Sequence, residues 1–213
     1  MSAAGDSKRS RPGRASASTV VGVGASAGGL DAIGELLSSL SVGAPAAYVV
    51  VQHLDPDRAS LLPELLARHT TMCVGQVRDG AQIACDHVYI IPPDADVVVD
   101  HGTLRLIPRH PAPGLHLPID LLFGSIADEY GAEGIGVVLS GTGADGTKGL
   151  ASIKSRGGMT FVQDPASARF SGMPESAIKA GVVDVVGTPS GIGQGIARVL
   201  ATSAPGGGSI QGR

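Results

Sequence analysis

Short runs of apolar, β-branched residues alternate with segments of helical periodicity along nearly the whole chain. The apolar runs are continuous, which is typical of strands that are buried on both faces of a parallel sheet. Such strands are expected at 19–24, 47–52, 87–92, 135–141, 159–164 and 182–187. Helices are expected at 29–40, 60–69, 118–131, 147–158, 174–181 and 189–202, and a β-hairpin at 96–108. This order predicts an α/β fold with a doubly wound, mostly parallel sheet, helices on both faces and an added β-hairpin.

The length of the chain suits one domain with a substantial core. Its 213 residues fall within the usual size range of a single domain. Residues 1–17 are small, polar and basic, and we expect a disordered tail there. We expect the domain itself over 18–202 and a flexible tail over 203–213.

The composition argues against several classes of function. The formal net charge of −3 gives no sign of a nucleic-acid partner. The sequence has neither a leader-like apolar segment nor an apolar run of spanning length, so we expect a soluble, cytoplasmic protein with no membrane insertion. Cys73 and Cys85 lack a paired spacing. We expect reduced, half-buried thiols there rather than a disulfide or a zinc site.

Three of the expected strands lead into residues that can carry chemistry. Ser26 follows the first strand, His53 follows the second, and Asp145 lies in the loop after 135–141. Because the carboxyl ends of parallel strands meet at one edge of the sheet, these side chains are expected to lie together. A serine becomes a nucleophile when an imidazole takes its proton, and a carboxylate on the other ring nitrogen fixes the tautomer. The combination therefore predicts acyl transfer.

Each of these residues also has a purely structural interpretation. Ser26 could cap the helix at 29–40, and Asp145 could cap the helix at 147–158. His53 could be a turn histidine that bonds to the backbone. All three interpretations would have to hold together, which favours the catalytic hypothesis.

Other chemistries fit the sequence less well. The segment VGVGASAGG also matches a dinucleotide fingerprint. A dinucleotide site, however, needs an acidic residue near the end of the second strand to bind the ribose, and Gln52 and His53 occupy that position here. GTGADGTK resembles a P-loop only superficially, because Lys148 does not directly follow the glycine. An α/β-hydrolase has a late histidine, whereas the last one here is His116. No second histidine stands at ligand spacing from His53, so we expect no catalytic metal and no cofactor.

Several separate blocks carry a resemblance to a known family. They are GVGASAGG, VVQHLDP, LPIDLLFGSIA, VVLSGTGADGTKGL and FVQDPASARFSGMPESAI. In this order and spacing, over roughly 18–202, the sequence resembles the catalytic domain of the chemotaxis protein-glutamate methylesterases, the CheB family. The resemblance implies a serine esterase that hydrolyses γ-glutamyl methyl esters on chemoreceptors. It also implies a protein-glutamine deamidase activity, which is frequent in the family.

The resemblance further implies a role for individual residues. Ser26 falls on the nucleophile, His53 on the base and Asp145 on the orienting acid. The backbone N–H groups of Ala27 and Thr142 fall on the oxyanion site. Ala27 stands where threonine is frequent, and SGTG replaces the usual TGMG, so that Thr142 stands where methionine is usual. Both departures are tolerable if these positions act through the backbone.

The resemblance also implies partners. These are the cytoplasmic helices of methylated chemoreceptors, with a receptor methyltransferase or a separate regulatory chain as a further candidate. The usual enzyme carries a phosphorylatable receiver domain, for which residues 1–17 are too few. We therefore expect either control by a partner chain or constitutive activity.

The segment RFSGMPESA could line the substrate cleft through Arg169, Gly172 and Met173, although a plain turn explains its glycine and proline equally well. Two other functions stay open. One is a serine esterase that acts on a non-chemotaxis protein or a small ester. The other is a catalytically idle adaptor that binds receptor helices or a methyltransferase.

Overall fold

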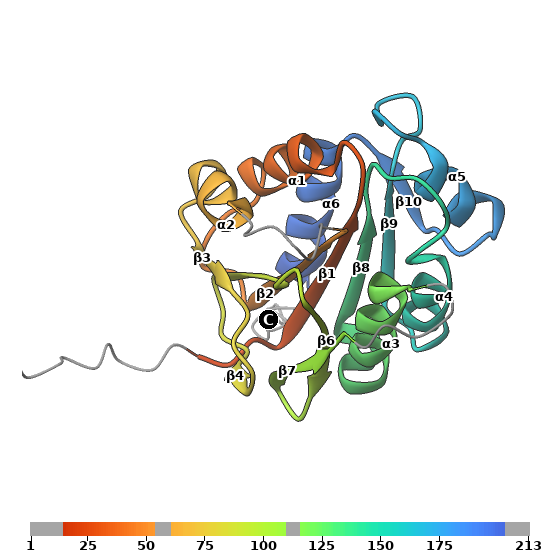
Figure 1. The fold of residues 1–213 in the computed structure, drawn as a ribbon. Coiled ribbons are helices and arrows are strands. Elements are labelled where there is room, and N and C mark those ends of the chain that lie inside the picture. The colour runs from red at the N-terminus through yellow and green to blue at the C-terminus, as the bar shows by residue number, and fades with distance from the viewer. Residues whose placement is uncertain (1–14, 54–60, 110–115, 203–213) are drawn as a thin grey trace, which may run out of the picture.

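The computed structural model describes residues 15–53, 61–109 and 116–202. Within these ranges, seven strands form one sheet in the order β10-β9-β8-β1-β2-β5-β3 (Figure 1). Their bounds are Thr19–Ala25 (β1), Ala46–Gln52 (β2), Cys73–Gln76 (β3), His87–Ile90 (β5), Gly134–Val138 (β8), Met159–Gln163 (β9) and Val185–Gly187 (β10). Every pairing of neighbours in this sheet is parallel. The predicted parallel sheet is confirmed.

Helices cover both faces of this sheet (Figure 1). One face is packed by α1 (Gly29–Ser38), α2 (Leu62–Leu66) and α6 (Pro189–Thr202). The other is packed by α3 (Pro118–Tyr130), α4 (Thr147–Ser155) and α5 (Gly172–Lys179). Short 3-10 turns at Ala67–His69 and Gly131–Glu133 extend α2 and α3. The doubly wound arrangement is thus confirmed, because two separate apolar cores lie on opposite sides of the strands.

The expected hairpin consists of β6 (Ala95–Asp100) and β7 (Thr103–Pro108). His101 and Gly102 form its two-residue turn with φ of 48° and 70°, the positive values that tight hairpin turns require. A further strand, β4 (Ala81–Gln82), pairs with β7 and makes a three-stranded antiparallel sheet. The sequence did not predict β3 or β4, because both are short and carry polar residues in place of a continuous apolar run.

Two glycines in β1 let α3 approach the sheet closely. A Cβ on Gly22 would lie 2.7 Å from Phe123 Cε1, and one on Gly24 would overlap Ile119 Cγ2. Both partners are fully buried on α3. The alternating glycines of VGVG are therefore explained by packing inside a strand, where glycine marks a close approach of another element.

The packed part of the chain begins before the expected boundary. Ser16 forms a β-bridge with Ala84, and Ala17 is 5% exposed and donates its N–H to Ile83 O. Residues 15–17 thus belong to the domain, whereas 1–14 and 203–213, the rest of the two expected tails, lie outside the described residues. Cys85 is half-buried as expected, but Cys73 is exposed. Among the described helices, none is long and apolar enough to cross a membrane.

Candidate active site

The structure brings together the serine, histidine and aspartate that follow three neighbouring strands. Ser26 follows β1, His53 follows β2, and Asp145 lies between β8 and α4. His53 Nδ1 is 3.2 Å from Ser26 Oγ, and His53 Nε2 is 2.9 Å from Asp145 Oδ2. The aspartate side chain is 3% exposed, whereas the histidine side chain is 31% exposed. The three groups form a hydrogen-bonded chain that runs from a buried carboxylate to the hydroxyl of a half-buried serine.

The orientation of the imidazole defines which nitrogen can act as a base. A carboxylate only accepts hydrogen bonds, so Nε2 of His53 carries the proton that points at Asp145. Nδ1 is then the unprotonated nitrogen, and it faces the Ser26 hydroxyl. The ring is thereby set to receive a proton from that hydroxyl. Serine proteases achieve the same result with the two nitrogens exchanged.

Asp145 is held by backbone donors around its whole carboxylate. Oδ2 accepts the N–H of Ile119 at 3.0 Å, and Oδ1 accepts those of Asp120 at 3.0 Å and Gly146 at 2.9 Å. The first two donors belong to the first turn of α3, where unpaired N–H groups and the helix dipole favour an anion. The N-cap of α4 is Gly146, which has no side-chain cap, so Asp145 does not cap that helix.

Asp120 lies beside this carboxylate and joins α3 to α4. Its Oδ1 accepts the N–H of Gly149 at 2.8 Å. Burial raises the pKa of Asp120, and the charge of Asp145 raises it further, while the hydrogen bond from Gly149 lowers it. Sequence reasoning missed this residue. The sequence feature that could have identified it is an acidic residue in the first turn of an otherwise apolar helix face.

The turn after β1 leaves the Ser26 hydroxyl free for His53. Ser26 donates its N–H to Ser140 O at 3.0 Å, and its carbonyl accepts the N–H of Gly29 at 2.9 Å. The N-cap of α1 is Gly28, with φ of 70° and no side-chain cap. The hydroxyl therefore does not cap α1, and the capping interpretation is wrong.

Two residues next to Ser26, Ala27 in the chain and Thr142 across the turn, have backbone N–H groups that the described part of the fold leaves unused. The carbonyl of Ser26 points at Gly29, so in the trans peptide that follows, the N–H of Ala27 points the opposite way. A Cβ on Gly141 would lie 2.9 Å from Ser26 Cβ, which places the exposed Thr142 next to the nucleophile turn. Within the described part of the chain, neither N–H group has a protein acceptor. Such donors can receive an oxyanion.

The loop from Arg169 to Met173 lies against this turn, but its residues differ in access. A Cβ on Gly28 would lie 2.8 Å from Arg169 Cβ, so the exposed arginine borders the nucleophile turn. Gly172 is half-buried, and a Cβ there would lie 3.2 Å from the N of Gly143. Met173 is fully buried, and its sulfur packs under Gly141. The Met173 side chain thus supports the loop from inside, whereas Arg169 and Gly172 are the members of the expected substrate-binding set that reach the surface.

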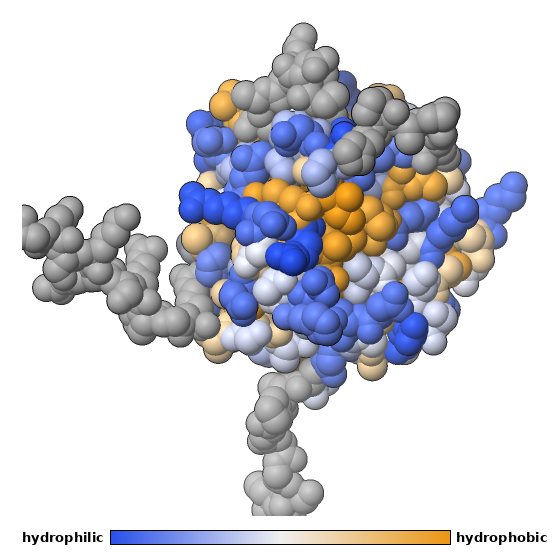
Figure 2. All heavy atoms as spheres, turned by 60° about the horizontal axis from the view of Figure 1, so that its bottom comes forward, coloured by the Kyte–Doolittle hydropathy of each residue, from blue (hydrophilic) through white to orange (hydrophobic). Residues whose placement is uncertain are grey.

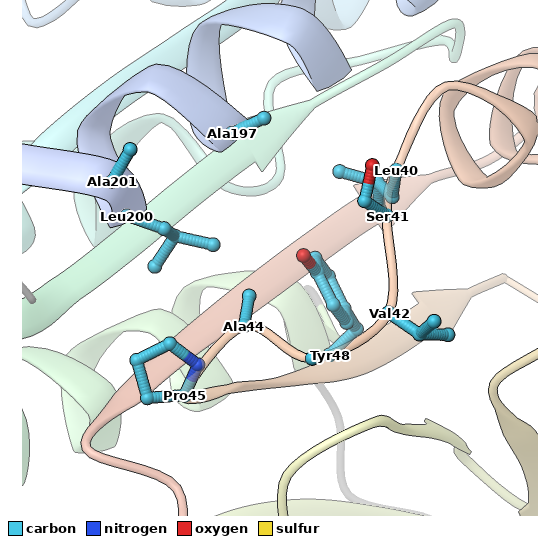
Figure 3. Close-up of a pocket in the computed structure, with 10 residues that line it drawn as sticks. Leu40, Ser41, Val42, Ala44, Pro45, Tyr48, Ala197, Leu200 and Ala201 are labelled. Atoms are coloured by element: carbon cyan, nitrogen blue, oxygen red, sulfur yellow. The ribbon is translucent and has the colours of Figure 1, made fainter.

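Other surface features lie away from these three residues. A cavity of about 370 Å³ lies where β2 begins, between the 40–45 loop and α6 (Figure 3). Figure 2 brings forward the bottom of Figure 1 and shows an apolar patch with hydrophilic residues beside it. The serine lies instead beyond the carboxyl end of β1, where the chain turns into α1 (Figure 1). The described residues contain no group of three or more His, Cys, Asp or Glu that could hold a metal ion.

Comparison with known proteins finds similar sequences and a similar fold. A family model described as CheB methylesterase matches residues 21–196. The crystal structure of the Thermotoga maritima CheB methylesterase catalytic domain superimposes with a TM-score of 0.77 at 28% identity, and the match covers 85% of this chain and 98% of that one.

Full-length relatives are longer than this chain. A protein of Photorhabdus laumondii named protein-glutamate methylesterase/protein-glutamine glutaminase is 37% identical over 175 residues, which are 80% of this chain and 50% of that protein. An uncharacterized 104.1 kDa protein of Rhodobacter capsulatus is 46% identical over 123 residues, which are 58% of this chain and 13% of that protein. The chain thus spans about half the length, or less, of these relatives.

Proposed function

The chain belongs to the CheB methylesterase family, and on this premise we propose that it is a serine hydrolase that removes methyl esters from glutamate side chains of chemoreceptors. The observation that carries the proposal is the hydrogen-bonded chain from Asp145 through His53 to Ser26. It supplies a nucleophile, a base and an orienting carboxylate, which together are what ester hydrolysis at neutral pH requires.

The proposed reaction proceeds through an acyl-enzyme on Ser26. Nδ1 of His53 takes the hydroxyl proton while Oγ attacks the ester carbonyl carbon, and the backbone N–H groups of Ala27 and Thr142 hold the oxyanion. The imidazolium, stabilised by Asp145, gives its proton to the methoxy oxygen, which leaves as methanol. Water then attacks the acyl carbon, loses a proton to Nδ1, and releases the glutamate as the proton returns to Oγ.

The same steps release ammonia when the substrate is a glutamine amide, so deamidation belongs to the proposal as a second reaction of one site. The proposed partners are cytoplasmic receptor helices, which implies a cytoplasmic location for this chain. Arg169 borders the nucleophile turn and is exposed. We assign it a contact with acidic side chains near the methylated glutamate.

Methanol release from methylated receptor membranes tests the proposal. The wild type should release methanol, and Ser26→Ala should reduce release to the uncatalysed background. Ser155→Ala, which removes an exposed helical hydroxyl that donates to Ser152 O, is the matched control and should keep wild-type activity. Retained release in Ser26→Ala would overturn the assignment. Hydrolysis of p-nitrophenyl acetate without methanol release would favour an esterase with another substrate.

A further inference from the structure

The hydroxyl of Ser140 lies at the junction of the nucleophile turn and the Arg169–Met173 loop. Ser140 follows β8 directly after Leu139 and is 1% exposed. Its Oγ donates to Ala27 O at 2.9 Å and accepts the N–H of Phe170 at 3.0 Å. Phe170 O is farther away, at 3.4 Å, so the single hydroxyl proton is directed at Ala27. One buried side chain therefore joins two loops that are distant in the sequence.

The backbone of Ser140 and Gly141 completes the same junction. Ser140 O accepts the N–H of Ser26 at 3.0 Å. Gly141 N donates to Phe170 O at 3.0 Å, and Gly141 O accepts the N–H of Met173 at 2.9 Å. The hydroxyl is the only one of these groups that contacts the Ala27 carbonyl among the described residues.

The Ala27 carbonyl is the point at which this hydroxyl can affect chemistry. Gly29 N–H fixes the peptide before Ala27 through Ser26 O, and Ser140 Oγ fixes the peptide after it. The N–H of Ala27 belongs to the first of these peptides, and the second bond anchors the chain on the other side of Ala27, so the turn that carries this N–H is held from both sides. Without the second bond, the peptide between Ala27 and Gly28 can rotate, and Gly28 has the conformational freedom of glycine to follow it. An oxyanion donor is effective only when it is held in place before the reaction.

We propose that Ser140 is a positioning residue, whose hydroxyl fixes the nucleophile turn so that the Ala27 N–H faces the developing oxyanion. This rests on the proposed serine hydrolase function. Ser140 does not touch the reacting atoms, and it acts through the Ala27 carbonyl.

A matched variant separates positioning from stability. Thr160 in β9 is likewise fully buried. Its Oγ1 lies 2.8 Å from two acceptors, Val182 O and Asp184 Oδ2, and it accepts the N–H of Asp184 at 3.0 Å. This second hydroxyl joins two segments in the same way, but it lies near the amino end of its strand. Thr160→Ala thus removes an equivalent buried hydroxyl away from the triad.

The experiment measures p-nitrophenyl acetate hydrolysis and thermal unfolding for the wild type and variants. Ser140→Ala should lower kcat about tenfold to a hundredfold with little change in KM, because an oxyanion donor is displaced. Thr160→Ala should lower the Tm but leave kcat unchanged. Ser140→Thr, which keeps the hydroxyl, should have a kcat close to that of the wild type. A wild-type kcat in Ser140→Ala, or an equal kcat loss in Thr160→Ala, would overturn the proposal. If Ser140→Ala fails to fold, Ser140→Cys replaces it with the same expectations.

Amide hydrogen exchange separates this proposal from the proposed function. In Ser140→Ala, a peptide covering residues 26–29 should exchange faster than in the wild type, and in Thr160→Ala it should not. This readout needs no turnover. Unchanged exchange at 26–29 in Ser140→Ala would overturn the positioning role, even if the wild type releases methanol from receptor membranes. If the wild type releases no methanol but exchange at 26–29 is faster in Ser140→Ala, the result would count against the proposed substrate alone.

Discussion

Gly24 in β1 lies directly against Ile119 in α3, with no room between them for a Cβ. Ile119 in turn donates its N–H to Asp145 Oδ2 at 3.0 Å. The missing side chain in the first strand therefore sets the position of the helix that holds the Asp145 carboxylate. This relationship ties the packing of the sheet to the geometry of the site.

Gly24→Ala should affect activity as well as stability. The new methyl group would push Ile119 and the first turn of α3 away from the sheet, which typically costs about 1–3 kcal/mol of stability. Because that turn holds Asp145, kcat should fall too. Urea unfolding and kcat measure both effects. Gly124→Ala in the same helix is the control: a Cβ there meets nothing within 4 Å, so activity should be unchanged. Full activity in Gly24→Ala would contradict the coupling.

Asp145→Asn should lower kcat by a factor on the order of 10⁴, as the equivalent change does in serine proteases. An amide N–H turned toward His53 Nε2 would favour the tautomer with its proton on Nδ1, and that nitrogen could no longer accept the Ser26 proton. Steady-state ester hydrolysis measures the loss. A variant that keeps more than about a tenth of wild-type kcat would show that the carboxylate does not set the tautomer.

Gly28→Ala should disturb the nucleophile turn directly. Gly28 has φ of 70°, a conformation that costs a residue with a side chain about 1–2 kcal/mol. The added Cβ would also lie 2.9 Å from Ser140 Oγ and 2.8 Å from Arg169 Cβ. We expect lower stability and a loss of kcat. Gly43→Ala has a similar positive φ but open space around it, so only stability should fall.

Asp184 should make stability depend on pH in the acid range. Burial alone would raise its pKa, but hydrogen bonds from Lys154 and Thr160 outweigh burial and hold the pKa below its usual value. A folded-state pKa below the unfolded one stabilises the protein above the unfolded pKa, and this stability is lost as the pH falls through the folded pKa. Asp184→Asn should thus be less stable than the wild type near neutral pH. The difference should shrink in urea unfolding at about pH 3, and a constant difference would contradict the assignment.

The sequence could predict the sheet because continuous apolar runs report strands buried on both faces. It could also predict that Ser26, His53 and Asp145 lie at one edge of the sheet, since the carboxyl ends of parallel strands meet there. It could not predict β3 or β4, whose short polar sequences resemble loops. Nor could it predict that Met173 is buried while Arg169 is exposed. The burial of Met173 depends on a packing partner, Gly141, that lies far away in the sequence.

The finer parts of the site depend on long-range contacts in the same way. The hold of α3 on Asp145 joins residues about 25 positions apart, and the Ser140 junction spans more than 100. Neither contact has a local sequence pattern that predicts it. Ser140 is a polar residue at the end of an apolar run, but such residues are common at strand ends that have no functional role.

Reaction with a serine-directed phosphonate tests the central claim most directly, because the reagent reacts with a serine that a neighbouring base has activated. Intact-mass and peptide analysis of the treated protein should find one adduct, on Ser26. Ser26→Ala should give no adduct, and His53→Gln should react far more slowly than the wild type. An unlabelled wild type, or an adduct on another serine, would contradict the assignment of Ser26 as a nucleophile activated by His53.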